Sequence, residues 1–367
     1  MQKIVIPNYE ECITNLACSI MKNFDLKTNH NSLPLIDDIL KKKSKNVVVI
    51  LYDGMGLNIM NKVLDANSFL VKHTLKGISS VSPSTTTAAT TSIMSGLNPV
   101  EHGWLGWDLY IKPVNKIVTM FLNTIKDTDS LVADYNVSKK YYPYKTITEQ
   151  INEKGLYHSK ILFPFGEDFY TDIDDMNKRI LQDCKKEGRQ YIYAYYTDPD
   201  STMHDFGTDS EKSIEVIKMI NRKTEELCSK LSDTTVIVTA DHGHINSEGI
   251  LLTDYPDFMD TLASDIWIEG RFSTFKVKEN KEKLFTDLFN KYFSEHFILK
   301  TKQEVIDEKI FGNGEENSLF RDSLGDYFAL AISNKYFRYN EFSVNLKSMH
   351  AGFTEDEMII PLIVIEK

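Results

Sequence analysis

Continuous apolar runs occur at three places along the chain. Residues 46–52, 190–196 and 234–240 read NVVVILY, QYIYAYY and TTVIVTA. These runs do not alternate with polar residues, and they are rich in β-branched and aromatic side chains. Both features are typical of strands that are buried on both faces of a parallel sheet. The pattern therefore predicts three central strands.

Helical periodicity separates these runs. A helix is predicted over 210–230, where four apolar residues fall on one stripe that suits packing on a sheet: Ile214, Ile217, Ile220 and Leu227. Thr146 and Glu149 form a capping box that predicts a further helix start. Strands that alternate with helices predict an α/β fold with a mainly parallel central sheet flanked by helices.

The segment 266–340 has a different pattern. Strand-like stretches such as RFSTFKVK and HFILKT surround the helical stretch EKLFTDLFNKYF. The chain has 367 residues, and a single hydrophobic core stops growing at roughly 250–300 residues. We therefore expect a small α+β module at 266–340, inserted into a larger domain formed by 1–265 and 341–367.

Charge, hydropathy and cysteine content indicate which partners and which cellular compartment suit the chain. The 53 acidic and 42 basic residues give a net charge of −11, which disfavours binding of long nucleic acids. No apolar run approaches the roughly 18 residues that suggest a membrane span, and the start of the sequence lacks the features of a signal peptide. The four cysteines are scattered without CxxC spacing. These features predict a cytoplasmic protein with reduced thiols and no membrane partner.

Aspartate follows each of the three predicted strands. Asp53 lies in LYDGMG, Asp198 and Asp200 lie in YYTDPDSTMH, and Asp241 precedes His242 in VTADHGH. Ligands of open α/β sheets bind beyond the carboxyl ends of the strands. A single aspartate after a strand is commonly a turn residue. Aspartates after three strands, two of them with a histidine nearby, favour a metal site. Carboxylate and imidazole together suit zinc and similar divalent ions.

Spacing supports the same interpretation. Asp200 and His204 are four residues apart, so both side chains share one face if this segment is helical. Asp241 and His242 are adjacent and reach one site only from a tight loop. His350 in SMHAGF adds another imidazole, although a lone histidine before a turn is usually structural.

The chain resembles the alkaline phosphatase superfamily, and within it the nucleotide pyrophosphatase/phosphodiesterase branch. The matching pieces occur in order as VILYDGMG, PSTT followed by TSIMSGLNPVEHG, DPDSTMHDFG, TADHGH and SMHAGFTEDEMIIPLIV. The resemblance implies an alkaline phosphatase-like fold, two divalent metal ions, and a threonine that is phosphorylated during turnover. The expected ions are Zn²⁺, with Mn²⁺ as the alternative.

The resemblance also implies two ligand sets. One metal is expected on Asp200, His204 and His350. The other is expected on four residues that include the nucleophile: Asp53, Thr86, Asp241 and His242. The nucleophile lies ten residues before a glycine in this branch, and counting back from Gly96 gives Thr86, with Thr85 and Thr87 as competitors.

The chemistry of threonine agrees with this role. Its hydroxyl is a weak nucleophile that needs activation, and coordination to a metal supplies it. A helix N-terminus at Thr86 would favour an alkoxide and a bound phosphoryl oxygen. Two further candidates lie beside the ligands: His244 and Asp198 are expected to form hydrogen bonds to them. Arg271 is a candidate phosphate contact, with a surface charge as the alternative.

One position departs from the pattern of nucleotide pyrophosphatases. These enzymes carry asparagine three residues after the nucleophile, and here the residue is Ala89. The preference between diesters and monoesters is therefore open. We expect a two-metal hydrolase of phosphodiester or pyrophosphate bonds, acting on a small phosphorylated substrate such as a nucleotide through a phosphothreonine.

Two alternatives accompany this expectation. The first is a phosphomonoesterase or phosphomutase of the same superfamily, whose metal ligands would be the same. The second is a non-catalytic, metal-binding partner protein that retains the fold. Loss of ligands is the usual mark of such a protein, and every ligand type is present here.

Overall fold

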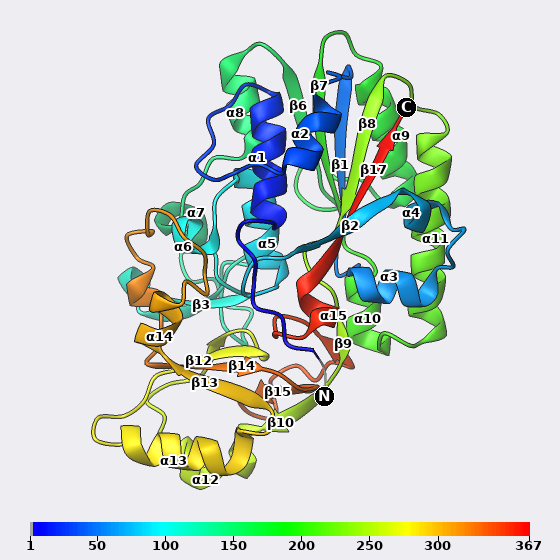
Figure 1. Ribbon diagram of the computed structural model, residues 1–367. Coiled ribbons are helices and arrows are strands. Elements are labelled where there is room, and N and C mark those ends of the chain that lie inside the picture. The colour runs from blue at the N-terminus through cyan, green and yellow to red at the C-terminus, as the bar shows by residue number, and fades with distance from the viewer. Residues whose placement is uncertain (1–2) are drawn as a thin grey trace.

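The computed structural model describes residues 3–367 and shows two sheets of different character (Figure 1). The first sheet has six strands in the order β2-β17-β8-β1-β7-β6. Its centre is formed by β1 (Asn46–Tyr52), which pairs in parallel with β7 (Gln190–Tyr196) and β8 (Thr234–Thr239). These are the three strands that the apolar runs predict. The predicted α/β fold with a mainly parallel central sheet is therefore confirmed.

The outer strands complete this sheet. On one side β6 (His158–Leu162) pairs in parallel with β7. On the other side β17 (Ile359–Glu366) is antiparallel to both β8 and β2 (Thr74–Ser79). Every residue of β1 is buried, because helices cover both faces of the sheet. This explains why the run at 46–52 is apolar throughout instead of alternating.

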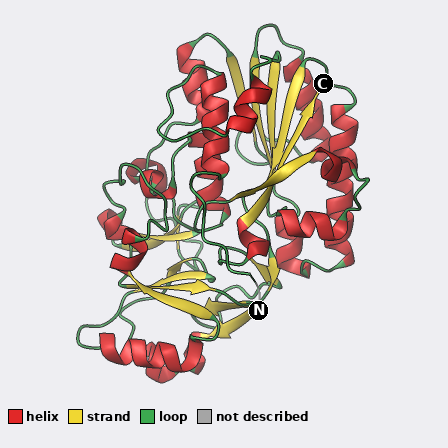
Figure 2. Cartoon of the chain, in the orientation of Figure 1, coloured by secondary structure: helices red, strands yellow, loops and turns green. Residues whose placement is uncertain are grey.

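Two groups of helices form these covering layers, as Figure 2 shows. The first group contains α1 (Ile13–Asn23), α2 (Pro34–Leu40), α5 (Thr86–Ser95) and α8 (Ile147–Lys154). The second contains α3 (Leu57–Val63), α4 (Phe69–His73), α9 (Ile173–Cys184) and α11 (Glu211–Cys228). Three residues of the apolar stripe predicted for α11 are buried in the hydrophobic core around the first sheet, which we call the first core: Ile217, Ile220 and Leu227.

The second sheet has seven strands in the order β13-β14-β12-β11-β3-β4-β5. Four come from the segment predicted as a module: β11 (Trp267–Ile268), β12 (Phe272–Phe275), β13 (Phe297–Thr301) and β14 (Tyr327–Ala331). Three come from earlier in the chain: β3 (Asp108–Ile111), β4 (Lys116–Thr119) and β5 (Thr124–Ile125). The segment 266–340 thus supplies only part of its sheet, and its separation as a module stays a prediction.

Aromatic packing holds this second layer together. The helix α13 (Glu282–Phe293) places Phe285, Phe289 and Phe293 against the sheet in one buried cluster. Further short elements complete the chain: α6 (Pro99–His102), α7 (Val137–Tyr141), α10 (Asp200–Phe206), α12 (Pro256–Met259), α14 (Lys302–Asp307), α15 (Glu355–Met358), β9 (Ile245–Asn246), β10 (Glu248–Leu251), β15 (Lys335–Arg338), β16 (Ser348–Met349), and 3₁₀ turns at Lys112–Val114, Leu252–Asp254 and Arg321–Ser323.

Two global features bear on the expected environment. Among residues 3–367, no helix has both the length and the apolar character needed to cross a bilayer. The four cysteines are buried and form no disulfide.

Candidate active site

The carboxyl ends of the central strands bring three loops together. Asp53 follows β1 directly, and its N–H donates to the carbonyl oxygen of Tyr196 at the end of β7 at 2.9 Å. The N–H of Asp200 donates in turn to the carbonyl oxygen of Asp53 at 3.0 Å. The N–H of Gly54 donates to Asp241 Oδ1 at 3.0 Å. The strand register therefore places all three predicted aspartates at one edge of the sheet.

Asp53, Asp241 and His242 form one buried cluster whose ligand atoms lie within 4.8 Å of one another. His242 Nε2 lies 3.4 Å from Asp53 Oδ1 and 3.6 Å from Asp241 Oδ2. Asp241 Oδ2 is buried and accepts no hydrogen bond from residues 3–367. A buried carboxylate oxygen without a donor, beside a second carboxylate and an imidazole, fits the donor set of a divalent ion.

Thr86 joins this cluster as the first residue of α5. Its hydroxyl oxygen lies 3.2 Å from His242 Nε2 and 3.5 Å from Asp53 Oδ1. The two competing threonines point elsewhere. Thr85 Oγ1 donates to Glu269 Oε1 at 2.5 Å, and Thr87 Oγ1 is buried without a partner among residues 3–367.

Asp200, His204, His244 and His350 form the second cluster, with ligand atoms also within 4.8 Å of one another. Asp200 and His204 lie one turn apart on α10, as their spacing predicts, and His204 Nε2 is 3.3 Å from Asp200 Oδ1. His350 Nε2 is 3.9 Å from the same oxygen. The three ligands predicted for one metal are thus brought together.

His244 has the supporting position that the sequence predicts. Its Nε2 lies 2.6 Å from Asp200 Oδ1, and its Nδ1 lies 3.0 Å from Ser348 Oγ. Asp198 does not have such a position, so that expectation is wrong. Its carboxylate accepts hydrogen bonds from the N–H and hydroxyl of Thr202, because it caps the first turn of α10.

Burial and mutual repulsion perturb the carboxylates of both clusters. Burial raises the pKa of Asp53 well above its usual value, and the charges of Asp200 and Asp241 raise it further. Burial also raises the pKa of Asp200, but His204 and His244 outweigh it and hold the pKa well below its usual value. Burial lowers the pKa of His350. Buried carboxylates crowded together in this way create a demand for cations, which suits divalent metals.

Glycines permit the close approach of these loops. Gly54 has a φ of 71°, and a Cβ there would lie 2.8 Å from a ring carbon of His244. At Gly243, a Cβ would lie 1.9 Å from the carbonyl oxygen of Asp356. Any other residue would therefore separate the loops that carry Asp53, Asp241 and His242.

Arg271 has neither of the roles considered for it. The side chain is fully buried, and Nε and Nη2 bind Glu357 Oε1 and Oε2 at 2.6 and 2.8 Å. Glu357 also accepts hydrogen bonds from the N–H of Gly352 and the hydroxyl of Thr354. The pair therefore holds the turn that follows His350. Its two members are 86 residues apart, so the sequence offers no local sign of it.

The site opens into a cavity of about 590 Å³. Thr86, Asp200, His204 and His350 line it together with Glu269 and other residues of the second sheet. Glu269 was not predicted from the sequence, since a lone glutamate between short strands carries no motif. Ala89, the position that departs from the family pattern, is fully buried in the first core and does not line the cavity.

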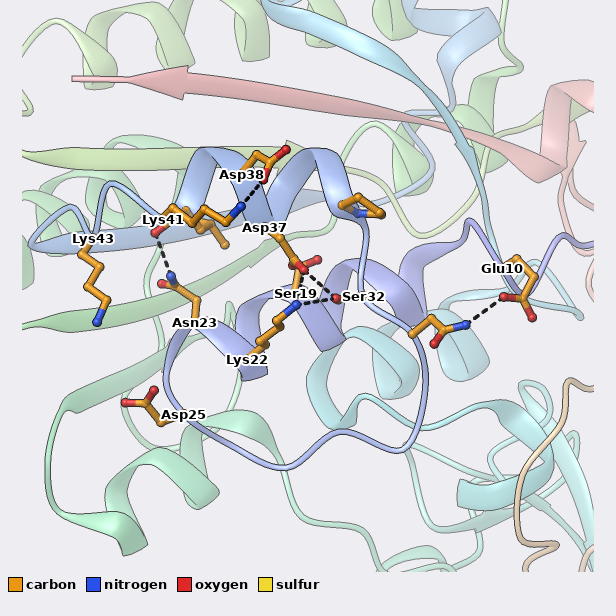
Figure 3. A pocket seen from close by; sticks show the side chains of 13 residues that line it. Glu10, Ser19, Lys22, Asn23, Asp25, Ser32, Asp37, Asp38, Lys41 and Lys43 are labelled. Atoms are coloured by element: carbon orange, nitrogen blue, oxygen red, sulfur yellow. Dashed lines mark hydrogen bonds and ion pairs between the residues drawn. The ribbon is translucent and has the colours of Figure 1, made fainter.

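A larger cavity of about 770 Å³ lies on α1, α2 and the loop between them (Figure 3). At its centre, Lys22 Nζ and Ser32 Oγ both donate to Asp37 Oδ2. Neither of the two metal-type clusters lies there. The chemistry is therefore concentrated in the smaller cavity.

A family model described as type I phosphodiesterase / nucleotide pyrophosphatase matches residues 47–304. The chain belongs to this family. It is therefore a hydrolase of the phosphodiesterase/nucleotide pyrophosphatase type, and the resemblance to this branch is confirmed. Family membership and the two clusters together support divalent metal ions as cofactors.

Solved structures agree in fold. Murine ectonucleotide pyrophosphatase / phosphodiesterase 5 superposes with a TM-score of 0.70 at 18% identity, covering 88% of each chain. An inactive variant of it, with threonine replaced by alanine and AMP bound, gives 0.69 at 18% identity over 86% of this chain and 87% of that one. The human protein gives 0.68 at 17% identity, covering 87% of each chain. A search of curated proteins found no match.

Proposed function

We propose that this protein hydrolyses phosphodiester or pyrophosphate bonds of a small phosphorylated substrate through a phosphothreonine on Thr86. The observation that carries the proposal is the position of one hydroxyl. Of three consecutive threonines, Thr86 places its Oγ1 3.2 Å from His242 Nε2 and 3.5 Å from Asp53 Oδ1. It also begins α5, where the helix N-terminus favours anionic oxygens.

The proposed cofactors are two Zn²⁺ ions. Asp53, Asp241 and His242, with Thr86, would hold one ion, and the second cluster would hold the other through Asp200, His204 and His350. Mixed carboxylate and imidazole donors suit zinc. When bound, two such ions stabilise negative charge on the attacking and leaving oxygens of an in-line displacement.

The chain itself supplies the nucleophile and its orientation. Oγ1 of Thr86 gives its proton to solvent and forms a bond to phosphorus while the bond to the leaving oxygen breaks on the opposite side, and the leaving oxygen takes up a proton. Water then attacks phosphorus of the phosphothreonine, the bond to Oγ1 breaks, the phosphate product leaves, and Oγ1 regains its proton. The first intrahelical bond of α5 runs from the N–H of Ala89 to the carbonyl of Thr85. The preceding N–H groups at Thr86, Thr87 and Ala88 are therefore available to a phosphoryl oxygen.

A relative supports the substrate class and the essential threonine. The murine structure with AMP is of a variant that is inactive and carries alanine in place of threonine. A nucleotide-like substrate is accordingly part of the proposal.

A cytoplasmic location also belongs to the proposal. It is supported by four buried cysteines without a disulfide, which is the usual state in a reducing compartment. Fractionation of cells that express the chain tests it, and recovery outside the cytoplasm would contradict it.

A comparison of two model substrates tests the proposed reaction. The zinc-loaded protein is assayed with bis-p-nitrophenyl phosphate and with p-nitrophenyl phosphate, and Thr86→Ala is the control. We expect faster turnover of the diester, lost in the variant. Preference for the monoester would instead support the phosphomonoesterase alternative, and a zinc-replete protein inert on both would support the non-catalytic alternative.

A further inference from the structure

Glu269 connects the second sheet to the start of the helix that carries Thr86. It lies in the turn between β11 and β12. Its Oε1 accepts hydrogen bonds from Thr85 Oγ1 at 2.5 Å and from the N–H of Trp107 at 2.9 Å. Oε2 has no hydrogen-bond or ion-pair partner among residues 3–367, and Glu269 lines the same cavity as Thr86.

No lysine or arginine among residues 3–367 forms an ion pair with this carboxylate. Two other acids away from the surface do have such partners: the buried Glu357 is paired with Arg271, and the half-buried Asp265 is paired with Lys126. Burial raises the pKa of Glu269 to about 7, although the hydrogen bonds from Thr85 and Trp107 lower it in part. A poorly solvated, unpaired acid in a cavity is a marker of function, since structural acids are normally paired.

The backbone is strained to hold this position. Ile268, directly before Glu269, has a φ of 81°, which a β-branched residue rarely adopts. Strain of this kind persists where the surroundings impose it, and it is concentrated at functional sites. Gly106 makes room for the turn, because a Cβ there would lie 2.6 Å from the carbonyl oxygen of Ile268.

The cations that line the cavity are engaged elsewhere. Lys126 Nζ binds Asp265 at 2.9 Å and Asp127 at 3.0 Å. Arg338 donates from Nε and Nη2 to the carbonyl oxygen of Ser343. Neither side chain therefore pairs with Glu269, whose carboxylate lies next to the start of α5 through its contact with Thr85.

We propose that Glu269 is a specificity-determining residue that discriminates against phosphomonoesters at the reacting phosphoryl group. The inference rests on the function proposed above. Above pH 7, where the Glu269 carboxyl is ionised, a monoester carries about two negative charges on three terminal oxygens, whereas a diester carries one charge on two. When Thr86 attacks in line with the leaving group, three other oxygens remain on phosphorus. In a diester one of them carries the second ester group, and in a monoester the same oxygen carries the additional charge. A carboxylate beside that side repels the monoester more strongly.

A ratio of two rates tests this role. Bis-p-nitrophenyl phosphate and p-nitrophenyl phosphate share one leaving group, so the ratio of their kcat/KM values reports on the rest of the phosphoryl group. Glu269→Gln retains an oxygen that accepts from Thr85 and Trp107, but removes the charge. We expect the monoester-to-diester ratio to rise about tenfold, the effect of removing one like-charge interaction in a partly solvated cavity.

Two further variants separate charge from structure. Glu269→Asp keeps the charge and should stay near the wild-type ratio. Asp129→Asn removes the same charge from an exposed residue of the same cavity and should leave the ratio unchanged. An equal fall for both substrates in Glu269→Gln would indicate a structural role and overturn the proposal. An unchanged ratio, or an equal rise in Glu269→Asp, would also overturn it.

Failure of the role proposed for Glu269 can be distinguished from failure of the proposed function. The proposed reaction fails if wild-type protein has no metal-dependent diester hydrolysis, or if Thr86→Ala retains it. The role of Glu269 fails if diester hydrolysis is present and depends on Thr86, but the ratio does not respond to the charge at 269.

Discussion

His204 Nδ1 lies 2.7 Å from the carbonyl oxygen of Ser348. The carbonyl can only accept, so Nδ1 carries the proton and Nε2 is left facing Asp200. The hydroxyl of the same serine lies 3.0 Å from His244 Nδ1. Ser348 thus orients two imidazoles of the second cluster, one through its backbone and one through its side chain.

Removal of His244 should therefore weaken binding of one metal ion. We expect His244→Ala to lower the affinity of one of two zinc sites about 10- to 100-fold, the usual effect of losing a group that orients a ligand. Titration against a chromogenic chelator measures this. Ser348→Ala, which keeps the carbonyl bond to His204, should have a smaller effect in the same direction. Identical titration curves for wild type and His244→Ala would refute this account of the cluster.

Arg271→Met should destabilise the fold strongly. The substitution leaves the fully buried carboxylate of Glu357 without its bidentate partner, and breaking a buried pair costs about 3–5 kcal/mol. Denaturant unfolding measures the free energy. The double variant with Glu357→Gln removes the orphaned charge and should recover part of the loss. A single variant as stable as wild type would contradict a structural role for the pair.

Stability should fall in acid because of His102. Burial lowers the pKa of this side chain to about 3, and its Nδ1 accepts from the N–H of Trp104 at 3.0 Å. The unfolded chain binds the proton near pH 6.5 and the folded one only near pH 3. Between these two pH values, each fall of one pH unit should therefore lower the free energy of unfolding by about 1.4 kcal/mol because of His102. His102→Asn, which retains an acceptor, should show a shallower slope, and an equal slope would disprove the assignment.

Removal of metal should abolish turnover without unfolding the protein. The first and second clusters lie at loop ends, whereas the cores consist of apolar side chains. We expect a strong chelator to eliminate diester hydrolysis and added Zn²⁺ to restore it, with little change in the far-UV circular dichroism spectrum. Full activity after complete chelation would exclude a metal-dependent reaction.

Much of the first sheet follows from sequence patterns alone. The runs at 46–52 and 190–196 coincide with β1 and β7 because strands buried on both faces must be apolar throughout. The aspartates after them could be placed together because parallel strands end at one edge. The resemblance to known motifs added His350, which no local pattern connects to Asp200.

The stretches RFSTFKVK and HFILKT are predicted as strands and contain β12 and β13, but the assembly of the second sheet and its contribution to the site could not be predicted. Its strand β11 has two residues, and it pairs with β3 at Ile268 and Asp108, which are far apart in the sequence. Strands this short carry no readable periodicity. The contact between Glu269 and Thr85 spans 184 residues, so it too arises only from tertiary packing.

The most direct test of the central claim is to trap the phosphorylated residue. The zinc-loaded protein is mixed with a slowly hydrolysed diester, quenched in acid during turnover and mapped by peptide mass spectrometry. Our account predicts one phosphate, on Thr86, absent from Thr86→Ala but present in Thr87→Ala. Phosphate on Thr85 or Thr87, or turnover by a metal-replete Thr86→Ala protein, would contradict it.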